Sequence, residues 1–438
     1  MNNQLTPKSY NYSFLIFLLF VLVTLANYYI YVGFAIKPYM IFLILFLTVH
    51  IGSFYFQRLH LFEMAMLLFY MMYSLSGSFA LYPASSIRII CGIILYIFCY
   101  FIMKSVIGNA KDLVIERAIA DAGILFNVAS LTLYFVGLKS LGFVFEGDRV
   151  YQFGVLLDRD YPRLIGLVQD PNFFVFYNTL FFSYFLCNSN SLKNKLGLLL
   201  CIIANLLTFS RGGILIMAFL VLIYIVINNP MKQLKLIVGL TVSLLVSVYI
   251  TIVYLHFDIF GILQSRVGDL SQDGGSGRLE LWGRAWDYFT SHMFFGIGAF
   301  NFSDYNFFQY GTSLLVHNTF LEILSESGLL GITCFCLFIL LVFVEIYQMK
   351  LIKKKPYLFL TFVGFILQMA FLSVIINDMF FMYLAILATY FHKEKYSLKS
   401  EKKKASFLSA IISSKPKIKL NVNYGRSDGN HEYSSHNR

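Results

Sequence analysis

Hydrophobic residues dominate the chain in long runs that short polar segments separate. A run of about 20 residues, folded as an α-helix, crosses a hydrocarbon core of about 30 Å. The runs do not alternate with polar residues, which argues against the strands of a membrane β-barrel. The pattern therefore predicts an all-α, polytopic integral membrane protein with about 12 transmembrane helices. The expected spans are residues 12–31, 38–56, 61–79, 87–107, 118–138, one that begins at Pro171, 196–209, 212–227, 236–256, 329–347 and two short spans within 357–391.

The polar segments between these spans predict an orientation. Lysine and arginine collect in cytoplasmic loops, and the basic loops of this chain are residues 188–195, 228–235 and 350–355. With these loops inside, both termini lie in the cytoplasm. The segment Lys139–Asp170, the turn at Arg211 and the long loop at residues 258–316, between spans 9 and 10, then all lie outside. We expect residues 1–392 to form the membrane domain and residues 393–438 to form a basic, disordered cytoplasmic tail.

Composition narrows the class of protein. The chain is 58% hydrophobic and only 13% charged, whereas a soluble domain has about 25% charged residues. The formal charge of +11 fits the basic loops, and no aromatic residues interleave with base-reading side chains, so we expect no nucleic-acid partner. All 6 cysteines fall in apolar runs without zinc-site spacing. Because the chain also lacks a Walker loop, a dinucleotide fingerprint and an Asp-rich metal motif, we expect neither cofactor nor metal.

Two arginines are candidates for binding an anion. Arg211 stands where a helix is expected to begin, between Ser210 and two glycines that let a ligand approach the backbone closely. Arg278 follows a glycine-rich run and precedes an amphipathic segment, Leu279–Phe289. A guanidinium group offers a planar fork of donors that suits phosphate oxygens. Alternatively, Arg211 is an interfacial side chain that reaches lipid headgroups, and Arg278 has only a structural role before an interfacial helix.

His317 is the candidate general base. An imidazole of ordinary pKa, about 6.5, accepts a proton near neutral pH. Asn318 and Glu322 follow closely and are placed to orient the imidazole or a sugar hydroxyl. Alternatively, a histidine at a helix start is a simple polar cap. The spacing of residues along the chain does not decide between these two roles.

Five motifs together resemble the bacterial O-antigen ligase/polymerase superfamily. Their order and the hydrophobic runs between them also match, over roughly residues 166–347. The motifs are GLVQDPNFF (166–174), LLTFSRGG (206–213), SGRLELW (276–282), FFGIGAFNF (294–302) and VHNTFLEILSESGLLG (316–331).

The resemblance implies a metal-independent, inverting glycosyltransferase at the periplasmic face of the bacterial inner membrane. Its substrates would be undecaprenyl-diphosphate-linked glycans, as both donor and acceptor, and membrane lipid and a chain-length regulator protein are further expected partners. Arg211 and Arg278 would bind the departing lipid diphosphate, and His317 would deprotonate the acceptor hydroxyl. Arg163 and Asp170, in the preceding outer loop, are further candidates for substrate contacts.

The branch of the superfamily is a finer question. The aromatic-rich, weakly charged sequence favours an O-antigen polymerase, which joins repeat units. A ligase that transfers the glycan to lipid A-core and a polymerase of capsule or exopolysaccharide are the alternatives. A flippase for lipid-linked sugars would share the hydropathy but would need ionisable groups along a path through the membrane. A scaffold of an export complex would tolerate the loss of Arg211.

Overall fold

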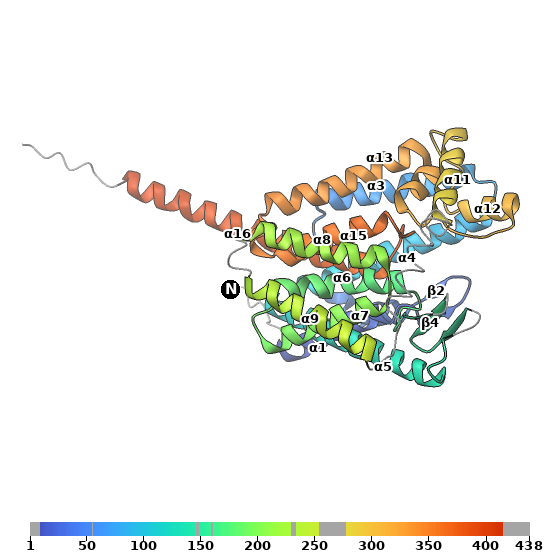
Figure 1. The fold of residues 1–438 in the computed structure, drawn as a ribbon. Coiled ribbons are helices and arrows are strands. Elements are labelled where there is room, and N and C mark those ends of the chain that lie inside the picture. Colours follow the sequence, from blue (N-terminus) through green and yellow to red (C-terminus); the bar gives the residue numbers. More distant parts are fainter. Residues whose placement is uncertain are drawn as a thin grey trace, which may run out of the picture. The chain divides into compact units, whose positions relative to one another are not determined.

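The computed structural model describes residues 9–54, 56–145, 149–158, 161–228, 234–253 and 277–414. Helices account for most of these residues (Figure 1). The chain divides into two compact units, Met1–His392 and Lys393–Arg438. The architecture below concerns the first unit except where α16 continues beyond it.

The N-terminal helices follow the predicted runs, with one short β-hairpin between the first two. α1 ends earlier than expected, and the residues that complete its predicted span include the hairpin, in which Ile30 pairs with Ile36. The capping box at the start of α3 uses His60 and Glu63. The elements are α1 (Ser9–Thr24), β1 (Ile30–Tyr31), β2 (Ala35–Ile36), α2 (Pro38–His50), α3 (Leu61–Ser76), α4 (Pro83–Gly108) and α5 (Asp112–Ser140), with short 3₁₀ turns at Ile51–Ser53 and Gly77–Phe79.

The segment between α5 and α6 contains a small antiparallel sheet that hydropathy did not predict. Its strands are β3 (Val150–Gln152), β4 (Val155–Asp158) and β5 (Tyr161–Leu164), in the order β3-β4-β5. The fold is therefore not wholly α-helical, because the backbone N–H and C=O groups of this loop form hydrogen bonds between β-strands. Gly154 packs against the backbone of α5 so closely that a Cβ there would lie 2.7 Å from the Tyr134 nitrogen.

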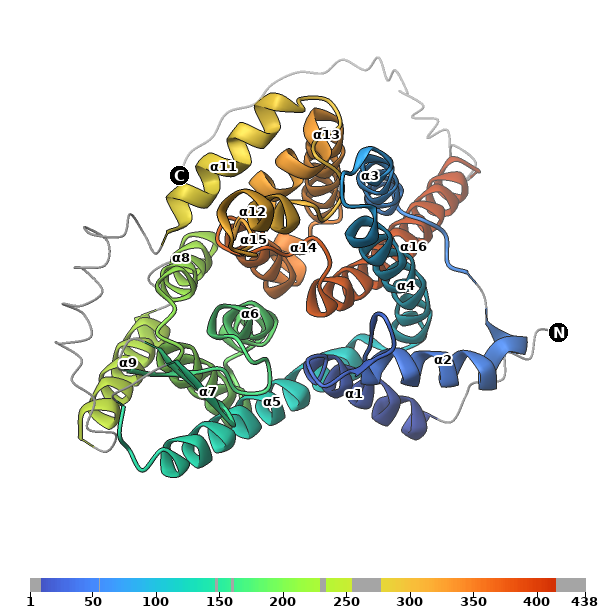
Figure 2. The same cartoon turned by 90° about the vertical axis from the view of Figure 1, so that its right-hand side faces the viewer.

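α6 (Pro171–Cys187) is the central helix of the bundle. The Asp170 carboxylate caps it and Pro171 opens it, as the Asp-Pro pair predicted. Every residue from Phe174 to Leu186 is buried. The helix packs against α5, α7, α8 and α15 (Pro356–Met369), and Figure 2 shows it enclosed by its neighbours.

Polar side chains connect the central helix to its neighbours. The Asn178 amide of α6 donates to Asn127 of α5 and to Asn205 of α7, each over 3.1 Å. All three amides are buried, and amides at such depth stabilise helix contacts only when paired. The surrounding helices are α7 (Leu192–Leu207), α8 (Arg211–Ile227) and α9 (Leu234–Val253).

Two helices, α11 (Arg278–Ser291) and α12 (Phe302–Tyr310), precede α13 (Thr319–Gln348). They lie at the same end of the bundle as the three-stranded sheet (Figure 1). α11 confirms the expected amphipathic helix, whereas α12 was not predicted. The first part of the predicted 258–316 loop, residues 258–276, lies outside the described residues.

α13 is kinked at Gly328, whose backbone has φ 63° and ψ −160°. At the kink, backbone groups of α13 form hydrogen bonds with the segment between α11 and α12. The Leu329 N–H donates to the Met293 carbonyl over 2.8 Å, and the Ile297 N–H donates to the Ser325 carbonyl over 2.9 Å. The predicted span at 329–347 is therefore only the second part of a longer, broken helix.

The C-terminal helices are α14 (Leu351–Lys354), α15 and α16 (Asp378–Ser414). Asn377 accepts hydrogen bonds from the N–H groups of Met379 and Phe380, at the start of α16. α16 continues to Ser414, so residues 393–414 are helical where a disordered tail was expected. The charged repeats at this position suit a helix, since lysine, glutamate and alanine are good helix formers. Residues 415–438 lie outside the described part of the chain.

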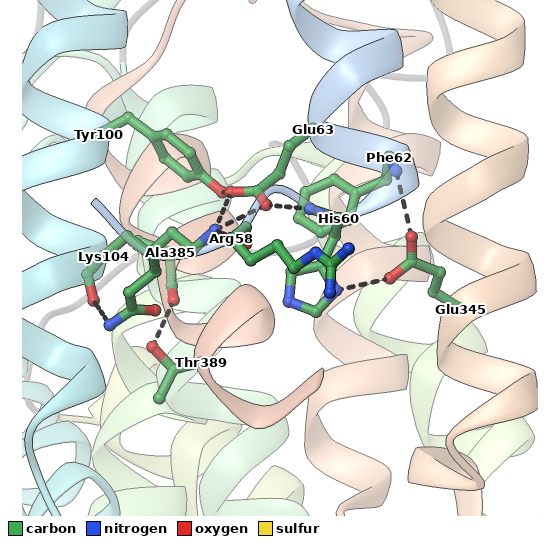
Figure 3. Close-up of polar contacts among 10 residues, drawn as sticks. Arg58, His60, Phe62, Glu63, Tyr100, Lys104, Glu345, Ala385 and Thr389 are labelled. Carbon is green, nitrogen blue, oxygen red and sulfur yellow. Dashed lines mark hydrogen bonds and ion pairs between the residues drawn. The ribbon is translucent and has the colours of Figure 1, made fainter. Parts of the chain in front are cut away.

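A buried ionic cluster ties α3, α4 and α13 together (Figure 3). The Lys104 ammonium donates to both Glu63 oxygens, over 2.7 and 2.6 Å. His60 lies 3.3 Å from Glu345, which also accepts the Phe62 N–H. Charges at this depth persist only when paired, so the cluster fixes how these three helices pack.

Within the described residues, three helices are long and apolar enough to cross a membrane, namely α4, α5 and α13. Shorter apolar helices are Tyr12–Thr24, Pro38–His50, Arg211–Ile227 and Pro356–Met369. This is the pattern of a helical membrane protein. The count of about 12 spans remains a prediction, because many helices are shorter than the predicted runs.

Candidate active site

Arg278 occupies the first position of α11. Gly277 precedes it with φ 70°, a left-handed conformation that favours glycine, and so turns the chain into the helix. Burial lowers the pKa of the Arg278 guanidinium, the Asp170 carboxylate raises it, and the nearby charges of Arg163 and Arg211 lower it again. The structure therefore brings four predicted charged residues into one electrostatic group.

Arg211 is likewise the first residue of a helix, α8, and its N-cap residue is Ser210. The Ser210 hydroxyl accepts the Gly213 N–H over 3.3 Å and donates to the Asn172 side chain over 2.8 Å. The second hydrogen bond joins the start of α8 to the start of α6. Phe209 has φ 49°, so a tight turn places Arg211 at the helix terminus.

His317 lies between α12 and α13 in a strained conformation, with φ 54°. Its backbone N–H donates to the Ser373 hydroxyl over 3.0 Å. The residue before it, Val316, accepts a hydrogen bond from the indole N–H of Trp282 over 3.2 Å. Burial lowers the pKa of the imidazole below its usual 6.5, the Arg278 charge lowers it further, and Asp170 opposes them. The imidazole is accordingly neutral at pH 7.

Asn318 and Glu322 have structural contacts that the sequence did not reveal. The Asn318 side-chain oxygen caps α13 by accepting the N–H groups of Phe320 and Leu321, over 3.0 and 3.2 Å. Glu322 is 1% exposed, and its carboxyl hydrogen-bonds to Ser373. Ser373 thus connects Glu322 with the backbone of His317. Both residues support the position of the imidazole.

Asp170 and Arg163 come from the segment that contains the sheet. One oxygen of Asp170 accepts the N–H groups of Asn172 and Phe173, both over 2.8 Å. Arg163, on β5, donates to the Thr208 carbonyl over 3.1 Å. Arg163 therefore holds the end of α7, just before the turn that carries Arg211.

Four helix N-termini meet at this site. Asp170 caps α6, Arg211 begins α8, Arg278 begins α11 and His317 lies two residues before α13. The electrostatic interactions of Arg278 with Asp170 and Arg211, and of His317 with Arg278 and Asp170, place these termini close together. The positive ends of these helix dipoles favour an anion near the site.

A small cleft, partly open to solvent, adjoins these termini. Arg278 forms one wall together with the first turn of α8, and the end of α15 forms another. The lining residues are Asn172, Ser210, Gly212, Gly213, Ile216, Arg278, Gln368, Phe371 and Leu372.

Sequence reasoning missed three residues of this region: Trp282, Gln368 and Ser373. Trp282 packs against the cluster that includes Leu281 and Val316. Gln368 and Ser373 lie in and after an apolar run, where hydropathy gives no sign of a site. The glutamine within this apolar run is the one sequence feature that could have indicated a site here, since polar groups at membrane depth are energetically costly.

The comparisons with known proteins agree with the motifs. The family model described as O-antigen ligase matches residues 196–336. This segment contains Arg211, Arg278 and His317, whereas Arg163 and Asp170 precede it. No curated protein matches the chain. The family match confirms, over residues 196–336, the resemblance to the O-antigen ligase/polymerase superfamily that the motifs indicated.

Proposed function

We propose that this protein is an O-antigen polymerase that joins undecaprenyl-diphosphate-linked repeat units by metal-independent, inverting glycosyl transfer. The observation that carries the proposal is the electrostatic group of Arg211, Arg278 and His317 at converging helix N-termini. The group combines cations for a leaving diphosphate with a neutral base for an acceptor hydroxyl. Both are needed at an anomeric carbon that is displaced with inversion.

The leaving group is the lipid diphosphate. As the bond between the anomeric carbon and the phosphate oxygen breaks, that oxygen takes the electron pair and gains negative charge. Arg278 and Arg211 stabilise this charge, and the N–H groups at the start of α8 add fixed dipoles. Because these groups are in place before the reaction, little reorganisation opposes the transition state.

The nucleophile is a hydroxyl of the acceptor sugar. Its oxygen bonds to the anomeric carbon on the face opposite the diphosphate, and its proton passes to the imidazole of His317. The lowered pKa of His317 keeps the imidazole unprotonated and available at neutral pH. Asp170 faces the imidazolium that forms and so offsets the repulsion from Arg278.

The other residues that were predicted to contact the substrate have positioning roles in this proposal. We propose that Arg163 and Asp170 act by placing Arg211 and Arg278, since Arg163 donates to Thr208 and pairs with Asp158, and Asp170 caps α6. Asn318 and Glu322 act through the position of His317 and not by direct contact with a glycan.

We propose about 12 membrane crossings with both termini in the cytoplasm and the site at the periplasmic face of the inner membrane. The location of α11, α12 and the sheet at one end of the bundle supports a single outer face (Figure 1). Cysteine accessibility tests this orientation. A cysteine at Gly311 should react with an impermeant maleimide in intact spheroplasts, whereas a cysteine at Lys353 should react only after lysis.

One gel of lipopolysaccharide from a strain that lacks this protein discriminates the branches. A polymerase predicts lipid A-core that carries a single repeat unit. A ligase predicts lipid A-core without glycan, together with accumulated lipid-linked polymer. Unchanged lipopolysaccharide with loss of capsule or exopolysaccharide would assign the polymerase to that glycan. A flippase predicts repeat units that stay on the cytoplasmic face, which would contradict glycosyl transfer by this chain.

A further inference from the structure

Gln368 lies in the wall of the cleft that Arg278 also lines. It belongs to the last turn of α15 and is 3% exposed. Its amide is therefore removed from bulk water, although the residue borders the cleft. A buried amide needs partners for both of its ends.

The nitrogen end of the amide is fully assigned. Nε2 donates to the Thr179 hydroxyl over 2.6 Å and to the Gly364 carbonyl over 3.1 Å. The Thr179 hydroxyl itself donates to the Val175 carbonyl over 2.8 Å, so it accepts from Gln368. The Gly364 carbonyl can only accept. Both contacts exclude the flipped amide, which would face two acceptors with its oxygen.

The oxygen end is the part that remains for a ligand. Gln368 Oε1 is buried and has no hydrogen-bond partner among the described residues. Because the orientation of the amide is fixed, this oxygen remains an unpaired acceptor in a residue that lines the cleft. A ligand that supplies an O–H or N–H donor there removes the cost of the unpaired carbonyl.

The two walls together describe one ligand. Arg278 and the first turn of α8 favour an anionic group, and Gln368 favours a neutral hydrogen-bond donor at the same cleft. A bare diphosphate at neutral pH supplies the charge but few donors. A sugar joined to the diphosphate supplies both.

We propose that Gln368 Oε1 forms a donor-sugar subsite, in which it accepts a hydrogen bond from a hydroxyl or amide N–H of the sugar attached to the lipid diphosphate. This inference rests on the proposed function, because the diphosphate itself must bind at Arg278. The subsite makes Gln368 a substrate-binding residue that contributes to donor selectivity.

The test compares two probes on the purified full-length protein in lipid nanodiscs. One probe is a polyprenyl diphosphate without sugar, and the other is the same lipid bearing one hexose. Wild type should bind the sugar-bearing probe about tenfold more tightly, the effect of one good hydrogen bond to a buried group. In Gln368→Met this preference should vanish, whereas affinity for the sugar-free probe should stay unchanged.

Thr179→Val is the matched control. It removes one partner of Nε2 but leaves Oε1 in place, so it should retain the preference for the sugar. Equal loss of the preference in both variants would assign Gln368 a packing role and overturn the inference. Retention of the preference in Gln368→Met would overturn it as well.

If Gln368→Met does not fold, a series of ligands tests the same subsite in the wild-type protein. Monodeoxy analogues of the hexose are bound to wild type, and removal of one particular hydroxyl should abolish the tenfold preference. An equal affinity for all analogues would refute the subsite alone. Failure of wild type to bind either lipid diphosphate would instead refute the proposed function. A preference that follows the acceptor glycan, measured with the unlinked oligosaccharide, would place Gln368 in the acceptor site and contradict the proposal.

Discussion

The indole N–H of Trp282 donates a hydrogen bond to the carbonyl of Val316, the residue directly before His317. Trp282 lies one turn after Arg278 on α11. One hydrogen bond therefore links the helix that begins with the arginine to the loop that carries the histidine. The distance between cation and base depends on this link.

Trp282→Phe should lower the rate of glycosyl transfer about threefold to tenfold, because it removes the hydrogen bond and keeps most of the ring. Trp286→Phe is the control, since Trp286 is 52% exposed and lies on the same helix. The measurement is transfer from a lipid-linked donor at equal protein amounts. Equal rates for the two variants would contradict the coupling.

Arg278→Ala should reduce transfer about 100-fold or more, the effect of removing one charge that stabilises a leaving group. Arg278→Lys should recover only part of this loss, because an ammonium lacks the planar fork of donors. Long-chain glycan on gels and the amount of protein in membranes are both measured. Long chains at normal length in Arg278→Ala would refute the assigned role.

The acid limb of the pH–rate profile should lie below pH 6.5, the usual pKa of histidine. Only the unprotonated imidazole accepts a proton, and both burial and Arg278 lower the pKa of His317. Activity should therefore persist as the pH falls to 6.5 and decline at lower pH. In Arg278→Gln the pKa of His317 should rise, because one of its two causes of depression is absent.

Isotope-labelled histidine makes the pKa measurable by NMR titration, with the His317 signal assigned from its loss in His317→Gln. This readout does not require a catalytically active variant. A His317 pKa above 6.5 in the wild type would be incompatible with the environment described here.

Ser373→Ala should lower kcat more than it raises KM, because it removes the acceptor of the His317 N–H and frees a strained backbone. Ser291→Ala is the control, since that hydroxyl is bonded only near its own helix turn and to His292. Restored kcat in Ser373→Thr would support a positioning role for the hydroxyl. An unchanged kcat in Ser373→Ala would exclude it.

Gly328→Ala should destabilise the protein by several kcal/mol. The backbone of Gly328 is in a region that other residues avoid, and a Cβ there would lie 2.4 Å from the Phe294 carbonyl carbon. Gly283→Ala is the matched control, because a Cβ at Gly283 in α11 meets nothing within 4 Å. That change should stabilise the helix by about 0.5–1 kcal/mol. Thermal unfolding in detergent measures both effects, and similar melting temperatures would contradict the kink.

The sequence predicted those features that local chemistry determines. Asp170 with Pro171 marked the start of α6, and the glycines before Arg278 marked the start of α11. The placement of Arg278 beside Arg211 was expected only from topology and motif order. The interaction between their charges is a tertiary fact that the structure adds.

The features that escaped prediction depend on contacts between distant segments. The sheet at β3–β5 is stabilised by pairing and by packing on α5, not by a strong alternation of polar and apolar residues. Gln368 becomes notable only because Thr179 and Gly364 take its nitrogen and leave its oxygen. Spacing along a chain contains no such information.

The enclosure of α6 has a consequence for how the bilayer acts on this enzyme. From Phe174 to Leu186 every residue of the helix is buried, and its N-cap residue, Asp170, interacts with Arg278 and His317. Changes in acyl-chain length or fluidity should therefore act on the helices that surround α6 and should not act directly on α6 itself. The register of the reactive groups along the membrane normal should then hold across membranes of different thickness.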